Sequence, residues 1–266
     1  VDDDGLWSID DLTAVVTART RVIAFAHVSN VTGMVAPVAD VVALARRLGA
    51  LTVLDACQSV PHHPVDFPSL GVDFAAFSAH KMLGPTGIGA LWGRKDLLDL
   101  LPPARTGGST ITTVTMESAQ FLPAPYRFEA GTQPVSQAVG FGAASDFLRA
   151  IGMPAVAAHE HEMTGLLVDA VVGTPGVRLI GVPQGAERGP LVSFVVEGVH
   201  AHDVGQFLDD RGVTVRTGHH CAQPLHRRLG AAATTRASAY VYTDAEEVAR
   251  FAAALTEVRP FFGADR

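Results

Sequence analysis

The chain has 266 residues, of which 48% are hydrophobic, so it can bury a sizeable core as one large domain or two smaller ones. Its formal net charge of −7, without any run of Lys or Arg, argues against a surface for nucleic acid or for an anionic membrane, and leaves small molecules and proteins as the expected partners. Two cysteines, no signal-peptide pattern and no long uncharged apolar stretch predict a cytoplasmic protein without a membrane-spanning helix.

The first part of the chain alternates short apolar runs with helical patterns, which is typical of a parallel sheet covered on both faces. A helix is predicted over residues 38–48, ending at Gly49. Strands are predicted at residues 22–28, 51–54, 74–77 and 88–92. Because open α/β sheets bind ligands at the carboxyl ends of their strands, we expect the chemistry there.

The later part has a different pattern, preceded by a Pro- and Gly-rich stretch. This stretch, residues 101–134, is predicted to wrap the surface or a dimer interface. Residues 136–172 indicate one or two helices, followed by strands at 177–180, 191–196, 213–216 and 236–240 and helices at 202–210 and 245–257. We therefore predict a large α/β domain over residues 1–145 and a smaller α+β domain over residues 146–266.

Two polar residues in the first part, Asp55 and Lys81, each follow a predicted strand. A pyridine ring that serves as an electron sink needs a carboxylate to keep its nitrogen protonated and a lysine to bind its aldehyde. Asp55 and Lys81 fit these roles, although such an Asp is also an ordinary helix cap or turn residue and a lone Lys is usually solvated. Beside Lys81, Ser78 and His80 can donate to a phosphate, and the glycines of residues 84–89 permit close backbone approach.

The run Ser78-Ala79-His80-Lys81, followed by Gly-Pro-Thr-Gly at residues 84–87, resembles the cofactor-lysine motif of class V aminotransferases and cysteine desulfurases. These are fold type I enzymes that use pyridoxal 5′-phosphate (PLP). The resemblance implies an α/β fold, with a mostly parallel sheet in the large domain, here incomplete, and a smaller α+β C-terminal domain.

The same resemblance implies roles for further residues. Asn30, within residues 27–33, approaches the cofactor and the substrate, and Gln58 contacts the pyridoxal hydroxyl. Ser78 and His80 bind the phosphate, and Thr132 reaches the phosphate in the neighbouring subunit of a homodimer. Together with Asp55 and Lys81, these residues form the expected cofactor site.

A second motif, residues 215–224, contains Arg216, two histidines and Cys221. A thiol that attacks sulfur must be partly ionised, and neighbouring Arg and His side chains on an exposed loop can lower the pKa of a thiol. The run resembles the short active-site loop of group II cysteine desulfurases of the sulfur-mobilisation type, whose cysteine takes the persulfide. The resemblance implies that Cys221 is the nucleophile and that Arg236 clamps the substrate carboxylate, a task suited to a guanidinium. Arg216 is a second candidate for substrate binding, with a surface ion-pair residue as the alternative.

The other cysteine and several histidines are not candidates for a site. Cys57 is interpreted as a buried, inert thiol. Adjacent residues such as His219, His220 and Cys221 seldom reach one ion together, so no metal site is predicted. The turn histidines 62 and 63 and the helix histidines 159 and 161 are also left out.

The resemblance implies that L-cysteine displaces Lys81 from the cofactor, that the freed amine removes the Cα proton, and that Cys221 attacks the substrate sulfur. The products are L-alanine and a persulfide, which passes to a sulfur-acceptor protein for iron–sulfur cluster assembly or other sulfur delivery. The alternatives are a selenocysteine lyase, another class V reaction, or a non-catalytic fragment that dimerises or docks the acceptor. Because the chain opens without Met and lacks the phosphate loop and the ring-stacking histidine of the family, a substantial N-terminal portion is expected to be missing.

Overall fold

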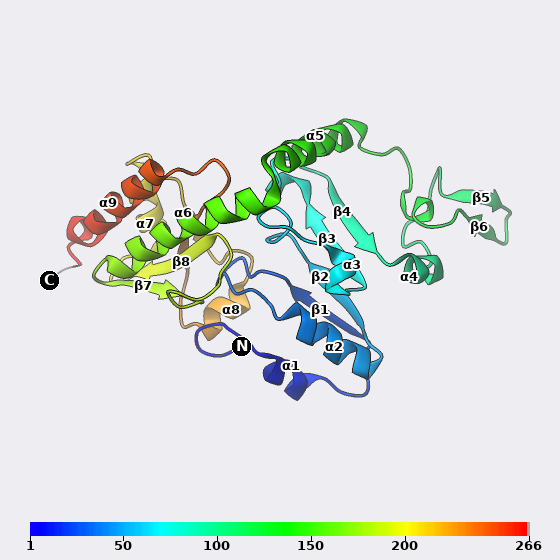
Figure 1. The fold of residues 1–266 in the computed structure, drawn as a ribbon, viewed down its shortest axis with the longest axis horizontal. Helices are drawn as coiled ribbons and strands as arrows, with labels where there is room; N and C mark the ends of the chain where they lie inside the picture. Colours follow the sequence, from blue (N-terminus) through cyan, green and yellow to red (C-terminus); the bar gives the residue numbers. More distant parts are fainter. Residues whose placement is uncertain (265–266) are drawn as a thin grey trace.

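The computed structural model describes residues 1–264, which form two four-stranded sheets and an outlying hairpin (Figure 1). The first sheet has the strand order β1-β2-β3-β4, with bounds Val22–Ala26, Leu51–Asp55, Phe74–Ser78 and Gly89–Gly93. Strands β1, β2 and β3 are parallel, and β4 runs antiparallel to β3. The prediction of a mostly parallel sheet is therefore confirmed, and each of its strands lies within two residues of the predicted bounds.

One helix, α2 (Val38–Leu48), packs on one face of this sheet and ends at Gly49, as predicted. Gly49 has a φ of 65°, a left-handed conformation that glycine adopts without a steric penalty. Ile23 points toward α2 and is buried, whereas Val22, Ala24 and Ala26 point to the opposite face and are exposed. The remaining short helices of this part are α1 (Ile9–Val15), α3 (Phe67–Leu70), η1 (Ala79–Lys81) and α4 (Lys95–Leu100).

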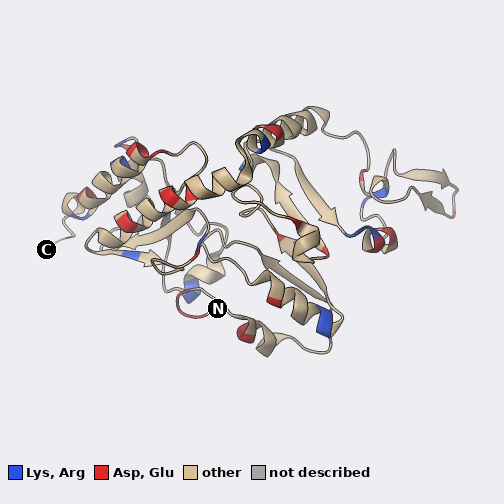
Figure 2. Cartoon of the chain, in the orientation of Figure 1, with Lys and Arg blue, Asp and Glu red and all other residues tan. Residues whose placement is uncertain are grey.

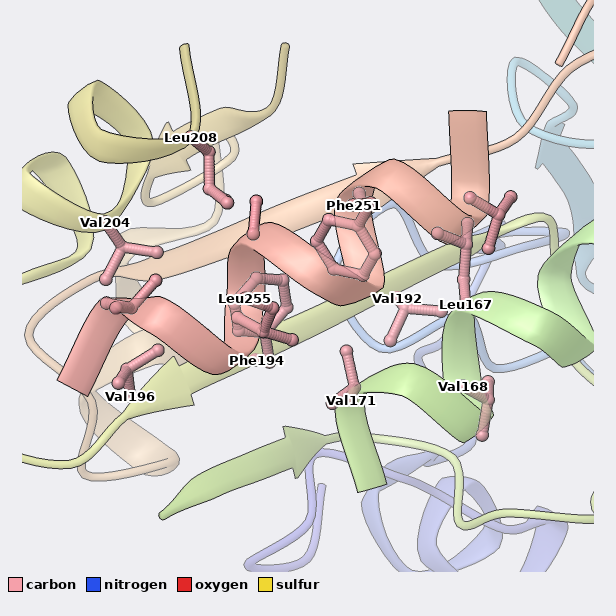
Figure 3. Close-up of a cluster of buried hydrophobic side chains, with 14 of the residues drawn as sticks. Leu167, Val168, Val171, Val192, Phe194, Val196, Val204, Leu208, Phe251 and Leu255 are labelled. Carbon is pink, nitrogen blue, oxygen red and sulfur yellow. The ribbon is translucent and has the colours of Figure 1, made fainter. Parts of the chain in front are cut away.

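The second sheet is antiparallel, with the order β7-β8-β10-β9. Its strands are Val177–Ile180, Leu191–Val196, Thr234–Ser238 and Arg216–Gly218 in that order, and its later helices are α7 (Ala201–Asp209), α8 (Gln223–Arg228) and α9 (Ala245–Phe262). Figure 3 shows its core, which contains Phe194 of β8, Val171 of the preceding helix and Leu255 of α9. All three side chains are at most 1% exposed, so this sheet and its helices form one hydrophobic core.

Two consecutive helices, α5 (Val135–Ile151) and α6 (Met153–Gly173), connect the two sheets. Gly152 separates them, and α6 runs along the second sheet (Figure 1). The predicted one or two helices are thus two. The predicted domain boundary between residues 145 and 146 falls inside α5, and the domain division stays a prediction.

Three sequence expectations need correction. Residues 101–134 contain an unpredicted hairpin, β5 (Ile111–Val114) with β6 (Ala119–Phe121), and a turn of helix, η2 (Tyr126–Phe128). Strands β9 and β10 are also shifted: β9 begins at residue 216 and not at 213, because its ladder with β10 pairs only residues 216–218 with 234–236. Strand β10 spans 234–238 and not 236–240, because its pairing with β8 ends at Ser238. Helix α9 extends five residues past its predicted end.

Charged side chains lie mainly on helices and loops, and the strands of the first sheet carry few of them (Figure 2). This distribution agrees with a sheet whose strands are built from apolar residues. Within residues 1–264, none of the helices combines the length and the apolar character that a membrane crossing needs.

Candidate active site

Asp55 and Lys81 lie at the carboxyl ends of neighbouring strands. Asp55 is the last residue of β2, and its exposed side chain accepts a hydrogen bond from the backbone N–H of Cys57 at 3.0 Å. Ser78 ends β3, and Lys81 closes the turn of 3-10 helix η1 that follows directly. Because β2 and β3 are parallel neighbours, these residues share one edge of the sheet, where α/β proteins bind ligands.

Cys57 joins the two strand ends. Its Sγ lies 3.6 Å from Ser78 Oγ, and its side chain is half-buried rather than fully buried as predicted. Burial, followed by the hydrogen bond with Asp55, raises the pKa of the Cys57 thiol, while Ser78 and the Lys81 charge act in the opposite direction. The net rise favours the protonated thiol. The interpretation of Cys57 as inert stays a prediction.

The glycines after Lys81 allow close approach to the protein backbone itself. A Cβ on Gly84 would lie 2.9 Å from the carbonyl oxygen of Ala79, and a Cβ on Gly89 would lie 2.5 Å from that of Phe77. Their absence of a side chain therefore lets the loop fold back onto β3 and η1. The approach of these glycines to a phosphate, which the sequence suggested, stays a prediction.

A buried pair joins His62, which is not among the candidates from the sequence, to Glu160 of α6. His62 Nδ1 and Glu160 Oε2 are 3.0 Å apart. Burial raises the pKa of Glu160 to about 9, and burial together with the Lys81 charge lowers the pKa of His62 to about 4. The pair therefore forms a neutral hydrogen bond and not an ion pair. No local sequence pattern could have found it, because the partners are 98 residues apart.

Cys221 lies on an exposed loop beside a guanidinium. Arg216 Nη2 is 3.4 Å from Cys221 Sγ, and both side chains are exposed. His220 has a φ of 49° and Cys221 a φ of 65°, so two consecutive residues with side chains adopt the left-handed conformation. Such backbone occurs where surrounding contacts enforce it, and often at functional sites.

Arg236 lies directly opposite Arg216 in the ladder between β10 and β9. Its Nη1 donates to the backbone oxygen of Asn30 at 2.9 Å, while its Nε is buried without a partner. Burial, followed by the charge of Arg216, lowers the pKa of Arg236 to about 10. Two cations opposite each other are unfavourable, so this position calls for an anion.

Asn30 connects the two groups of predicted residues. It follows β1, at the same edge of the first sheet as Asp55, and its Nδ2 donates to the backbone oxygen of His220 at 2.7 Å. The structure thus brings Asn30, Arg216, Cys221 and Arg236 into one set of contacts. Lys81 and Cys221 form no hydrogen bond with each other in the part of the chain that is described.

The remaining predicted residues lie apart from these contacts. Gln58 is half-buried in the turn after Asp55, and His80 is exposed in η1. Thr132 is exposed just before α5, on a segment that Figure 1 places after the outlying hairpin. Among residues 1–264, no group of three or more His, Cys, Asp or Glu side chains is placed to hold a metal ion.

The residues at the strand ends fit the phosphorylated pyridine cofactor that the resemblance implies. Asp55 offers an exposed carboxylate, and Ser78 offers a hydroxyl at the end of the next strand. Lys81 follows within one turn of helix, and the unpartnered Nε of Arg236 matches a substrate carboxylate. This donor set combines the carboxylate, the amine and the phosphate donors that such a cofactor needs.

Residues 1–251 match the family model of class-V aminotransferases. The chain is 59% identical to "Probable cysteine desulfurase 2" of Mycobacterium leprae, over 99% of its own length and 62% of that protein. It is 44% identical to "Cysteine desulfurase" of Haloferax volcanii, over 98% of its own length and 61% of that protein. The chain thus spans about three fifths of the length of these relatives.

Solved structures share this architecture. The cysteine desulfurase CsdA of Escherichia coli in its S-sulfonic acid form superposes with a TM-score of 0.92 at 32% identity, over 98% of this chain and 64% of that one. The cystine C–S lyase C-DES, in complex with its product cysteine persulfide, superposes with a TM-score of 0.81 at 26% identity, over 94% of this chain and 64% of that one. Another structure of C-DES carries glycine covalently linked to its PLP cofactor. The predicted fold type I class is confirmed by these similarities.

Proposed function

The chain belongs to the class V aminotransferase family, and we propose that it works as a PLP-dependent cysteine desulfurase, which converts L-cysteine to L-alanine and a persulfide on Cys221. The observation that carries this proposal is the cross-strand pair Arg216 and Arg236 beside the exposed Cys221 thiol. A substrate with a carboxylate and a sulfur atom matches this combination, and the names of the relatives point to the same substrate class.

Arg236 is the better candidate for the substrate carboxylate, and Arg216 for the thiol. Arg236 has a free N–H at Nε, and an anion there would offset its repulsion with Arg216. Arg216 Nη2 already donates to Cys221 Sγ, the sulfur of the proposed nucleophile, and so holds this side chain in place. The two arginines therefore have separate tasks in the proposed reaction.

When bound, PLP would supply the electron sink that stabilises negative charge at the substrate Cα. Asp55 would hold the proton on the ring nitrogen, Lys81 would bind the aldehyde, and its amine would then take the Cα proton. The Cys221 thiolate attacks the substrate sulfur, so that an S–S bond forms and the Cβ–S bond breaks. The carbon skeleton takes up protons and leaves as alanine.

The other assignments are part of the same proposal. Ser78, His80 and Thr132 bind the phosphate, with Thr132 acting across a homodimer, and Asn30 and Gln58 approach the ring. The proposal also includes a large domain over residues 1–145 and a small domain over residues 146–266. It further includes a cytoplasmic location and a sulfur-acceptor protein that supplies iron–sulfur cluster assembly.

Other activities use different parts of this arrangement. A selenocysteine lyase could use the same thiol, whereas transamination and epimerisation need no Cys221. A non-catalytic chain that dimerises or docks a sulfur acceptor would need neither Lys81 nor Arg236 in its present place.

The experiment is to mix the purified chain with PLP, remove the excess, and record the visible spectrum before and after adding L-cysteine. We expect a band of bound cofactor that shifts with L-cysteine while alanine appears. Selenocysteine serves as the comparison substrate. A chain that shows no band and forms no alanine contradicts the proposal and favours a non-catalytic role.

A further inference from the structure

Three buried side chains behind Cys221 form a chain of hydrogen bonds. His220 Nε2 lies 2.9 Å from Thr234 Oγ1, and His226 Nε2 lies 3.0 Å from the same oxygen. His226 Nδ1 lies 3.0 Å from the carbonyl oxygen of Ala222. Thr234, His226 and His220 are 0%, 1% and 2% exposed, so water does not compete for these partners. The hydrogen positions therefore follow from the partners themselves.

The carbonyl of Ala222 determines which atom donates and which accepts in each of these hydrogen bonds. A carbonyl only accepts, so His226 Nδ1 carries a hydrogen, and we assign His226 Nε2 as the acceptor of the Thr234 hydroxyl. The Thr234 oxygen then accepts from His220 Nε2. This leaves His220 Nδ1 as a bare acceptor, in agreement with its having no partner. The opposite direction would bury an unpaired N–H there, which is the costlier defect.

The backbone that these hydrogen bonds hold in place is strained. His220 and Cys221 are both in the left-handed region, which residues with a Cβ avoid. The buried His220 ring is fixed by Thr234 of β10, and the carbonyl of His220 is fixed by Asn30. Release of the ring would let both residues return to an ordinary conformation, which moves Cys221 Sγ away from Arg216.

We propose that Thr234 and His226 are positioning residues, which hold His220 and thereby keep the Cys221 thiol beside the Arg216 guanidinium. What the thiol then does rests on the proposed function, but its placement does not. These hydrogen bonds run from His226 of α8 through Thr234 of β10 to His220 of the loop, so helix α8 and strand β10 together fix the position of Cys221.

The first test is the rate at which iodoacetamide alkylates Cys221 in the purified chain, followed by mass spectrometry of the peptide that carries it. Thr234→Val removes the shared hydroxyl at constant shape, and we expect about a tenfold slower reaction, as for the loss of one buried hydrogen bond. Thr234→Ser keeps the hydroxyl and should restore the rate. Thr235→Val is the matched control, because Thr235 is equally buried in the same strand but its hydroxyl donates to Ala201 O.

A rate for Thr234→Val equal to or above that of Thr235→Val would overturn the proposal. A second measurement needs no variant: ¹⁵N NMR of the histidine rings should show His220 protonated at Nε2 and His226 at Nδ1. The reverse assignment would also overturn it. Neither measurement involves PLP or L-cysteine, so a failure of this proposal is distinct from a failure to form alanine.

Discussion

Replacing Glu160 by Gln tests how the fold accommodates a buried carboxyl that is hydrogen-bonded to His62. Glu160 is 2% exposed, and burial raises its pKa from 4.5 to about 9. It donates to Nδ1 of His62, whose pKa burial lowers to about 4, so the pair holds a single proton at neutral pH. In the unfolded chain the Glu160 carboxyl has its ordinary pKa, so it loses its proton once the pH rises above that value.

The sign of the pH effect follows from this difference. Between the unfolded pKa of 4.5 and the folded pKa of about 9, the folded chain holds a proton that the unfolded chain has lost, so the free energy of unfolding falls as the pH rises. One proton corresponds to about 1.4 kcal/mol per pH unit. From about pH 6 to about pH 8, Glu160 therefore lowers the stability by up to about 3 kcal/mol.

Glu160→Gln removes this dependence, because the amide cannot ionise and still donates to His62 Nδ1. The assay is urea unfolding of both proteins at the two pH values. Glu162→Gln is the control, since Glu162 is an exposed carboxylate in the same helix. If wild type and Glu160→Gln lose the same stability between the two pH values, Glu160 is ionised in the folded chain and the reasoning is wrong.

Four further changes test the candidate site and the loop that carries it. Cys221→Ser should stop alanine and persulfide formation while leaving the absorbance of bound PLP; loss of both would contradict a purely nucleophilic role. Lys81→Ala should remove the band of covalently held cofactor from the visible spectrum, and a variant that keeps it would refute the lysine assignment. Arg236→Lys keeps the charge but loses the planar fork, so the KM for L-cysteine should rise by about tenfold or more in alanine assays, whereas an unchanged KM would place the carboxylate elsewhere. Gly89→Ala puts a Cβ 2.5 Å from the oxygen of Phe77, and thermal unfolding should show a loss of roughly 1–3 kcal/mol; a neutral effect would mean that the loop can move.

Local sequence patterns predicted the first sheet well. Its strands are short apolar runs between turns, and Gly49 marks the end of α2 both in the sequence and in the structure. The hairpin at residues 111–121 was not predicted because most of its side chains are exposed, so no face of it shows the alternation that indicates a strand. Residues 213–215 have a strand-like composition, yet pairing begins at Arg216, because the neighbouring strand decides where a ladder starts.

The candidate site could be predicted residue by residue but not as an arrangement. The motif around Lys81 and the loop around Cys221 each carry their chemistry in a few consecutive positions. The links between them join residues far apart: Asn30 and His220 are separated by 190 positions, and Glu160 and His62 by 98. Such contacts depend on how the two sheets pack, and no periodicity within a single segment encodes that packing.

The segment of residues 30–33 explains how the two sheets hold one site without a direct bond from Lys81 to Cys221. Every residue in this segment is bonded to the second part of the chain. Asn30 binds His220 and Arg236, and the three following carbonyls accept from Ser193 Oγ at 2.6 Å, Val182 N at 3.2 Å and Gly189 N at 2.9 Å. Because the segment follows β1 after three residues, it fixes the loop of Cys221 and the side chain of Arg236 relative to the edge that carries Asp55 and Lys81. The position of this edge relative to the second sheet is therefore set by several hydrogen bonds from backbone and side-chain donors, and the loss of one of them should leave it in place.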